Sequence, residues 1–440
     1  MAAHAKLSPS SAFRWTTCTA SPSQEAGKDS PNSLASMQGT AEHQVSAECL
    51  ESGAQPETYV GRTLLFWRDG DRTGEAWADS LPTWQAVATV YHQIVIDADS
   101  AARCRAYVDF VRDLVNSLGA TLFVEQRLPI DHITGEAGAK GTSDAVLLAG
   151  SELIICDAKF GRGKVNAYDV VKPAVRDADG NEIEPAVLAP NKQLAMYADG
   201  ARREFEWMGE ITSVRMIIVQ PALNHVSEYA HSIERHLAFV DTLRQAAEAT
   251  RSNPVFAPSA DNCFFCCGRM DCQSRNATAM ALAAGAFDDL DATPAAAVAR
   301  APADKQLGTL FSKLPFIRSW LDDIETRVRD TLAAGGEVVS DDGRYELVPG
   351  RQGARKWVDE TAAEQALSKM RLGDDMYHRK LISPTDAEKL SKADADGKSR
   401  LGPRQWNKLA ALIARDDGKQ KIVLRPAAPT ATDSSTDLFS

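Results

Sequence analysis

Two aspartates and a lysine are spaced so that they can act on one substrate: Asp144, Asp157 and Lys159. Asp144 begins one short apolar run and Asp157 closes the next, across a turn at Gly150. Adjacent antiparallel strands joined in this way bring the two carboxylates close together, and Lys159 lies on the same face as Asp157. Carboxylates held so close repel each other unless a cation lies between them, and their hard oxygen atoms suit Mg²⁺ or Mn²⁺. The spacing therefore predicts a divalent metal site.

A metal and a lysine at such a site indicate phosphodiester chemistry. The metal can polarise the phosphodiester and lower the pKa of a bound water. The lysine can orient or deprotonate that water and stabilise the charge that develops on phosphorus. The simpler alternative is a strand-end salt bridge of Asp157 with Lys159, and an isolated Asp-x-Lys favours that alternative. The surrounding residues therefore decide between the two.

Three residues outside these strands are candidates for the same site. His43 stands in a helical pattern, and neutral imidazole is a good ligand for ions such as Mn²⁺. Gln193 and Tyr197 lie four apart on a helix expected around residues 190–205, so they share one face. Each has a plainer alternative, since the histidine could be satisfied by nearby polar groups and the tyrosine could be a half-buried core residue.

Glu125 is a further candidate, on the strand expected before Asp144. Its carboxylate could bind a metal or a water molecule. The alternative is an ion pair with Arg127 or Lys140.

Four of the eight cysteines crowd into ten positions: Cys263, Cys266, Cys267 and Cys272. In a reducing cytoplasm such crowding indicates metal ligation and not disulfides. The pattern Cys263-x2-Cys266-x5-Cys272 supplies three thiolates. Cys267 could be the fourth ligand, but two adjacent residues seldom both point at one centre. Four thiolates suit a 4Fe–4S cluster or tetrahedral zinc.

The elements that must position these residues follow from the apolar patterns. Short, partly β-branched runs separated by Gly-containing turns predict strands at residues 122–128, 144–148, 153–159 and 214–220. Helical patterns occupy residues 82–98, 101–118, 190–205, 230–250, 304–334 and 403–415. The order helix, three strands, helix, strand predicts an α/β fold with a mixed sheet flanked by helices.

The composition limits the class of protein. The 440 residues are 44% hydrophobic, and no apolar run reaches eighteen residues, so we expect a soluble, cytoplasmic protein that has no contact with a membrane. The net charge of -11 counts against nucleic-acid binding unless positive charge gathers locally. A local cluster is present, although a solvated face is its simpler explanation; it consists of Lys159, Arg162, Lys164, Lys172 and Arg176.

We expect four parts along the chain. Residues 1–275 form the core that carries the chemistry, and residues 276–303 are an Ala-rich linker. Residues 304–426 form a mainly helical domain, and residues 427–440 are a disordered tail. The tail closes in Asp-Leu-Phe, which resembles the motifs by which bacterial replication and repair proteins dock on the sliding clamp. A chance Leu-Phe pair in a solvated tail is the alternative.

Several of these elements together resemble nucleases of the PD-(D/E)xK superfamily, in the RecB-like branch. The resemblance implies a restriction-endonuclease-like fold and a metal-dependent DNA nuclease. It implies that Asp144 and Asp157 bind the metal, that His43 completes the metal site, and that Lys159 acts on the attacking water. The matching elements, in chain order, are Gly39-x3-His43, Glu125, Asp144, Asp157-x-Lys159 and Gln193-x3-Tyr197.

The cysteines resemble those of the iron–sulfur members of that branch, which include AddB-type helicase–nucleases and CRISPR adaptation exonucleases. There the fourth cysteine lies far upstream, in the place that Cys18 occupies here. The resemblance therefore implies a 4Fe–4S cluster on Cys18, Cys263, Cys266 and Cys272, with zinc as the alternative. Such a cluster would join the two ends of the nuclease core.

The chain is also similar to an uncharacterised family of phage and prophage proteins with this core. The shared segments are Ser8 to Cys18, Gly141 to Asp144, Asp157 to Gly163, Arg355 to Trp357 and Leu381 to Lys389. This implies an exonuclease, or a structure-selective nuclease, in phage DNA replication or recombination, with DNA and phage proteins as partners. One alternative is a catalytically silent DNA-binding subunit of a recombination complex. Another alternative is a zinc-stabilised structural protein, but it does not explain Gln193 and Tyr197.

Overall fold

The computed structural model divides the chain into two units, Met1–Trp320 and Leu321–Ser440, and each is described by itself. No helix among the described residues is both long and apolar enough to cross a membrane. The residues described are 5–28, 33–70, 72–80, 89–176, 182–287, 304–349, 355–370, 372–377, 381–392, 399–415 and 421–426.

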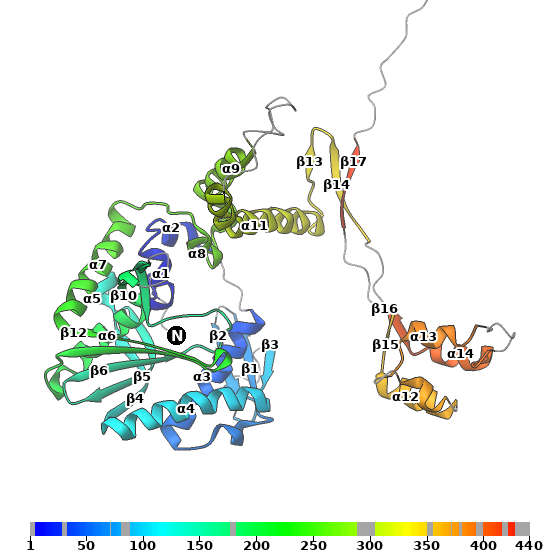
Figure 1. Ribbon diagram of the computed structural model, residues 1–440, viewed down its shortest axis with the longest axis horizontal. Helices are drawn as coiled ribbons and strands as arrows, with labels where there is room; N and C mark the ends of the chain where they lie inside the picture. The colour runs from blue at the N-terminus through cyan, green and yellow to red at the C-terminus, as the bar shows by residue number, and fades with distance from the viewer. Residues whose placement is uncertain are drawn as a thin grey trace, which may run out of the picture. The chain divides into compact units, whose positions relative to one another are not determined.

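A five-stranded mixed sheet lies at the centre of the first unit (Figure 1). Its strand order is β12-β11-β6-β5-β4. Strands β4, β5 and β6 form an antiparallel meander, β6 pairs with β11 in parallel, and β11 pairs with β12 antiparallel. The bounds are β4 (Thr121–Pro129), β5 (Lys140–Ala149), β6 (Glu152–Ala158), β11 (Ser213–Gln220) and β12 (His225–Ser232).

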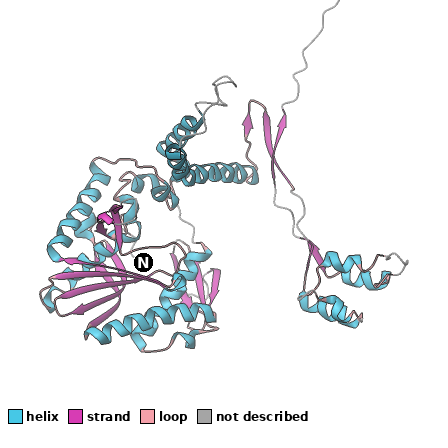
Figure 2. Ribbon diagram, viewed as in Figure 1, coloured by secondary structure: helices cyan, strands magenta, loops and turns pink. Residues whose placement is uncertain are grey.

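Helices cover both faces of this sheet (Figure 2). The α6 (Lys192–Glu204) and α7 (Ile233–Ser252) helices pack on one face, and α3 (Leu34–Ser52) and α4 (Ala98–Leu118) pack on the other. Because β6 is buried on both sides, it reads as a continuous apolar run without alternation. The expected α/β fold with a mixed sheet between helices is thus confirmed.

The helix boundaries follow local capping groups. The Asn191 side chain accepts hydrogen bonds from the backbone N–H groups of Gln193 and Leu194, which starts α6. Asp97 caps α4 in the same way, and Gly119 ends it in the left-handed conformation that glycine adopts most easily. The expected helices at 101–118 and 190–205 are both present.

The prediction of a helix at residues 82–98 is wrong. Residues 89–95 form β3 (Thr89–Val95), which pairs with β1 (Thr63–Asp69); β1 pairs in turn with β2 (Arg72–Trp77). The β-branched residues of this segment pack better on a sheet than in a helix, and the helix starts only after Asp97. Residues 82–88 lie outside the described residues.

The residues between β6 and α6 in the sequence form two short antiparallel ribbons. A ribbon joins β7 (Tyr168–Lys172) to β10 (Val187–Pro190), and a smaller one joins β8 (Val175–Arg176) to β9 (Glu182–Glu184). The sequence patterns predicted neither of them.

The N-terminal segment packs against the cysteine-rich segment of the same unit. The Gln24 side-chain amide donates to the Gly268 carbonyl at 3.1 Å, and the backbone N–H of Cys267 donates to Oε1 of Glu25 at 3.2 Å. The described residues of the unit also form the helices η1 (Pro9–Ser11), α1 (Ala12–Trp15), α2 (Ser21–Glu25), η2 (Pro56–Tyr59), α5 (Asp131–Thr134), η4 (Glu206–Met208), η5 (Pro221–Leu223), α8 (Ala260–Phe264), η6 (Arg269–Asp271) and α9 (Gln273–Phe287).

The second unit contains sheets as well as helices. The helix expected at 403–415 ends early, because residues 413–415 pair with another strand. Residues 288–303 of the expected linker and the whole tail, 427–440, lie outside the described residues. The α11 helix (Asp304–Ala333) crosses the boundary of the units, and the other elements are β13 (Val339–Ser340), β14 (Gly343–Val348), β15 (Arg355–Trp357), α12 (Glu360–Lys369), α13 (Pro384–Lys389), α14 (Pro403–Ala410), β16 (Ile413–Arg415) and β17 (Lys421–Pro426).

Candidate active site

Asp144 and Asp157 lie next to each other where β5 and β6 separate. The ladder of these strands ends at the pair Ala145 and Cys156, so the two aspartates occupy the next positions. Asp144 Oδ2 accepts a hydrogen bond from the backbone N–H of Ala158 at 2.7 Å. The carboxylate thus satisfies a backbone donor just past the end of the ladder, and this holds it beside Asp157.

Lys159 is held between β6 and α6. Its ammonium nitrogen lies 2.7 Å from Oδ2 of Asp157 and donates to Oε1 of Gln193 at 3.2 Å. Its backbone N–H donates to the Val219 carbonyl at 2.9 Å, which extends the pairing with β11. The simple salt bridge weighed for Asp157 and Lys159 is therefore present, but it belongs to a larger group.

The first two turns of α6 carry the expected glutamine and tyrosine to this group. The Gln193 amide donates to Oδ1 of Asp157 at 3.5 Å and to the Tyr197 hydroxyl at 3.3 Å. Tyr197 is also a core residue, only 5% exposed. Burial, and then the charge of Asp157, raises the pKa of Tyr197 well above its ordinary value.

His43 reaches Asp144 from α3, on the other face of the sheet. Its Nδ1 lies 3.3 Å from Oδ1 of Asp144, and its ring packs edge to face on Phe160 at a centroid distance of 5.1 Å. His43, Glu125 and Asp144 each offer one ligand atom, and these atoms lie within 4.8 Å of one another. Asp157, expected in the metal site, is not part of this group, and one of its oxygens is paired with Lys159.

Glu125 owes its position to an unusual backbone conformation. Its φ is +47°, in the left-handed region, and it interrupts the pairing of β4 with β5 between Val124 and Gln126. Such a conformation costs a residue other than glycine about 1–2 kcal/mol. Among the described residues Glu125 forms an ion pair with neither Arg127 nor Lys140, so its carboxylate is directed to the acidic group.

The electrostatics of the site reflect this crowding of acids. Desolvation, and then the charge of Asp144, raises the pKa of Glu125 to about 7. Burial acts to raise the pKa of Asp144, but His43 and Lys159 outweigh it and hold that pKa below its ordinary value. Burial raises the pKa of Asp157 in spite of Lys159. Three carboxylates therefore face one lysine and one histidine, which favours an added cation.

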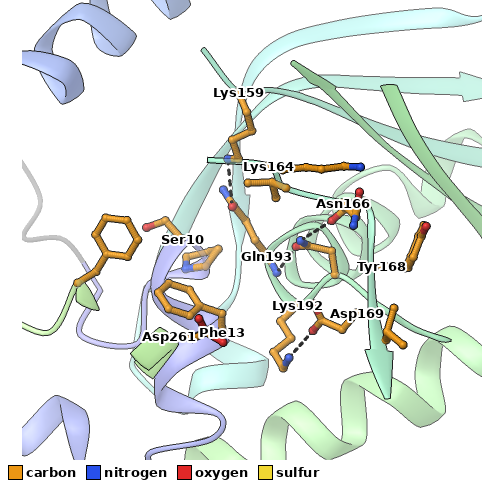
Figure 3. A pocket seen from close by; sticks show the side chains of 15 residues that line it. Ser10, Phe13, Lys159, Lys164, Asn166, Tyr168, Asp169, Lys192, Gln193 and Asp261 are labelled. Carbon is orange, nitrogen blue, oxygen red and sulfur yellow. Dashed lines mark hydrogen bonds and ion pairs between the residues drawn. The ribbon is translucent and has the colours of Figure 1, made fainter. Parts of the chain in front are cut away.

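A pocket of about 570 Å³ opens beside Lys159 and Gln193 (Figure 3). Two lysines of the expected basic cluster, Lys159 and Lys164, line it. Lys172 instead pairs with Glu184, and the side chain of Arg176 lies outside the described residues. The sequence patterns missed the other lining residues that matter here: Ser10, Phe13, Asn166, Tyr168, Asp169, Asn191, Lys192, Asp261 and Phe265.

Cys18 lies close to the segment that contains the other candidate cysteines, but among the described residues the four sulfur atoms do not form a group close enough to bind one metal ion. The Cys18 sulfur accepts a hydrogen bond from the backbone N–H of Ala257 at 3.4 Å. Burial raises the pKa of Cys263, and the neighbouring Cys272 and Cys18 add to that rise. Cys267 is turned toward α2, where its sulfur lies 3.6 Å from Oε1 of Glu25.

The other cysteines lie apart from this group. They are buried with the α3 and α4 side of the sheet, as small apolar residues: Cys49, Cys104 and Cys156.

The fold and the site together define an α/β protein with a cluster of acids and a lysine at one end of its mixed sheet. The chain matches a family described as "Protein of unknown function (DUF2800)" over residues 4–428, and it belongs to that family. It is also similar to a solved structure titled "Crystal structure of SSO0001", with 14% identity, a TM-score of 0.20, and coverage of 38% of this chain and 67% of that one. A TM-score of this size supports no statement about the fold.

Proposed function

We propose that this protein is a metal-dependent deoxyribonuclease with the PD-(D/E)xK fold of the RecB-like branch. The observation that carries the proposal is the contact of Lys159 with both Asp157 and Gln193, beside Asp144. A salt bridge that served only stability would need neither the glutamine nor the second acid.

The donor atoms of the site fit Mg²⁺ or Mn²⁺. His43 offers an imidazole nitrogen, and Glu125 and Asp144 offer carboxylate oxygens, within 4.8 Å of one another. Asp157 lies beside them and adds negative charge. When bound, the ion would polarise a phosphodiester and lower the pKa of an attacking water.

The residues of this chain then have separate tasks. Lys159 donates hydrogen bonds to the water or to the phosphate and stabilises the charge that develops on phosphorus. Gln193 holds the Lys159 ammonium on the side of α6, and Tyr197 holds the Gln193 amide. Asp157 keeps the lysine close to the acids.

We further propose that Cys18, Cys263, Cys266 and Cys272 hold a 4Fe–4S cluster with a structural role. Two observations support this ligand set: Cys18 lies beside the segment that contains the others, and Cys267 faces Glu25 instead. Four thiolates also suit zinc, so metal analysis must separate the two.

The biological setting that we propose is phage DNA replication or recombination in the cytoplasm of a bacterial host. DNA is then the substrate, and phage recombination or replication proteins are the partners. Docking of residues 431–440 on a sliding clamp remains a proposal from the sequence of the tail.

The experiment that tests the nuclease uses the purified full chain with end-labelled linear DNA and with closed circular DNA. Cleavage in the presence of Mg²⁺ or Mn²⁺ is compared with cleavage in EDTA. Asp144→Asn should remove cleavage, and Asp113→Asn, which changes an exposed acid on α4, should retain it. Cleavage of the circle would mean internal cutting, whereas loss of label from linear DNA alone would mean action from ends. No cleavage with either ion would favour the silent DNA-binding subunit.

A further inference from the structure

The pocket beside Lys159 has an aromatic wall that a metal site does not need. Phe13 and Phe265 line it, with ring centroids 6.2 Å apart and planes nearly perpendicular. Phe265 is 66% exposed, although exposure of so large an apolar ring to water is unfavourable. One broad face of an aromatic side chain is thus available to a ligand within the pocket.

The same pocket carries positive charge. Lys159, Lys164 and Lys192 line it, against the acids Asp169 and Asp261. Lys192 is paired with Asp169, whereas no ion pair is found for the exposed Lys164 within the part of the chain that is described. Figure 3 draws Lys164 on the side of the pocket away from Phe13. The ammonium group of Lys164 can therefore bind an anionic group of a ligand.

The aromatic wall is carried by the two segments that bear the cysteines. Phe13 precedes Cys18 by five residues, and Phe265 lies between Cys263 and Cys266. These segments are distant in sequence, and their packing against each other closes this side of the pocket.

We propose that the pocket binds one unpaired nucleotide of a DNA strand, with its base stacked on Phe265 and a phosphate held by Lys164. The strand then leads past Lys159 and Gln193 to the acids. This deepens the proposed function and rests on it.

An unpaired nucleotide fits these features better than a base pair within a duplex. A volume of about 570 Å³ lies in the range of pockets for small molecules, about 300–1,000 Å³. Stacking on a side chain needs a free base face, and in a duplex each face is covered by the next base pair. Unpaired bases stack on aromatic rings without regard to sequence, and lysines contact the phosphate backbone of the strand.

The test measures binding apart from cleavage. The full chain in EDTA, with Ca²⁺ as a second condition, is titrated into a fluorescent single-stranded oligonucleotide and into a blunt duplex of the same length. We expect tighter binding of the single strand. Phe265→Ala should weaken that binding by roughly tenfold, the effect of losing one stacked aromatic ring. Lys164→Ala should weaken it and reduce its dependence on salt by about one counterion.

Phe264→Ala is the matched control. Phe264 is the adjacent residue in the same Cys263 to Cys266 segment and is 58% exposed, but it does not line the pocket. It should bind as the wild type does, and Phe265→Trp should restore most of the binding that Phe265→Ala loses. Equal binding by the wild type and Phe265→Ala would overturn the pocket assignment, as would an equal loss in Phe264→Ala.

The outcomes separate the two proposals. If the wild type cleaves DNA but Phe265→Ala binds and cleaves normally, the nuclease stands and the nucleotide pocket fails. If single strands bind through Phe265 but no divalent ion supports cleavage, the pocket stands and the nuclease fails.

Discussion

The ammonium group of Lys159 lies 2.7 Å from Oδ2 of Asp157, whose side chain is almost fully buried. Removal of one partner from such a pair leaves an uncompensated charge, which typically costs about 3–5 kcal/mol. The pair therefore affects stability as well as chemistry, and the two effects can be separated by experiment.

We predict that Lys159→Met lowers the free energy of unfolding by about 3 kcal/mol and abolishes cleavage. The double variant Asp157→Asn with Lys159→Met should recover most of the stability, because both charges of the pair are removed together, and yet stay inactive. Urea unfolding and the DNA cleavage assay check the two parts. A double variant that regains activity would mean that the pair is structural only.

Glu125 offers a second separation of stability from chemistry. Its left-handed backbone suits glycine, so Glu125→Gly should be about 1 kcal/mol more stable than Glu125→Ala. Both variants lack the carboxylate, and both should bind Mn²⁺ more weakly than the wild type in a calorimetric titration. Equal stability of the two variants would show that the left-handed conformation does not persist at this position.

The cysteine centre makes a third prediction. Protein purified without oxygen should contain iron and acid-labile sulfide, and Cys18→Ser or Cys266→Ser should lose both. Cys267→Ser is the control, because Cys267 faces Glu25, and it should retain them. A result of one zinc per chain without iron would show that the cysteines hold zinc and not an iron–sulfur cluster. Loss of the metal in Cys267→Ser, with retention in Cys18→Ser, would move the fourth ligand to Cys267.

The parts of the fold that the sequence predicted correctly are those fixed by local pattern. The strands β4, β5, β6 and β11 follow short apolar runs between turn residues, and α6 follows a capped helical period. The segment at residues 82–98 was misread because its apolar spacing also fits a helix. There the pairing of β3 with β1 outweighs that local signal, and pairing between distant strands leaves little trace in the sequence.

The candidate site divides in the same way. Residue type and spacing are sufficient to identify Asp144, Asp157 and Lys159. The antiparallel pairing of two consecutive strands brings these residues together. Phe13 and Phe265 meet only through the packing of two distant segments, so no local pattern pairs them. The available signal was chemical: two adjacent phenylalanines between Cys263 and Cys266 are an unusual choice for an exposed segment.

A last prediction concerns a histidine at the end of β12, His231, and one in the first turn of α7, His236. Nε2 of His231 lies 3.3 Å from Nδ1 of His236, and both side chains are buried. Burial lowers the pKa of each to about 4; Arg235 adds to this at His231, while Asp199 opposes it at His236. The folded protein therefore keeps these imidazoles neutral at a pH where the unfolded chain, with a histidine pKa of about 6.5, is protonated.

Because the unfolded chain binds more protons between about pH 6.5 and pH 4, stability must fall as the pH is lowered through that window. The slope is about 1.4 kcal/mol per pH unit for each histidine that titrates independently. We predict that His231→Gln with His236→Gln has a flatter decline than the wild type in urea unfolding at pH 7, 6 and 5. His92→Gln on β3 is the control and should follow the wild type. Parallel curves for the double variant and the wild type would mean that the pair is protonated in the folded protein.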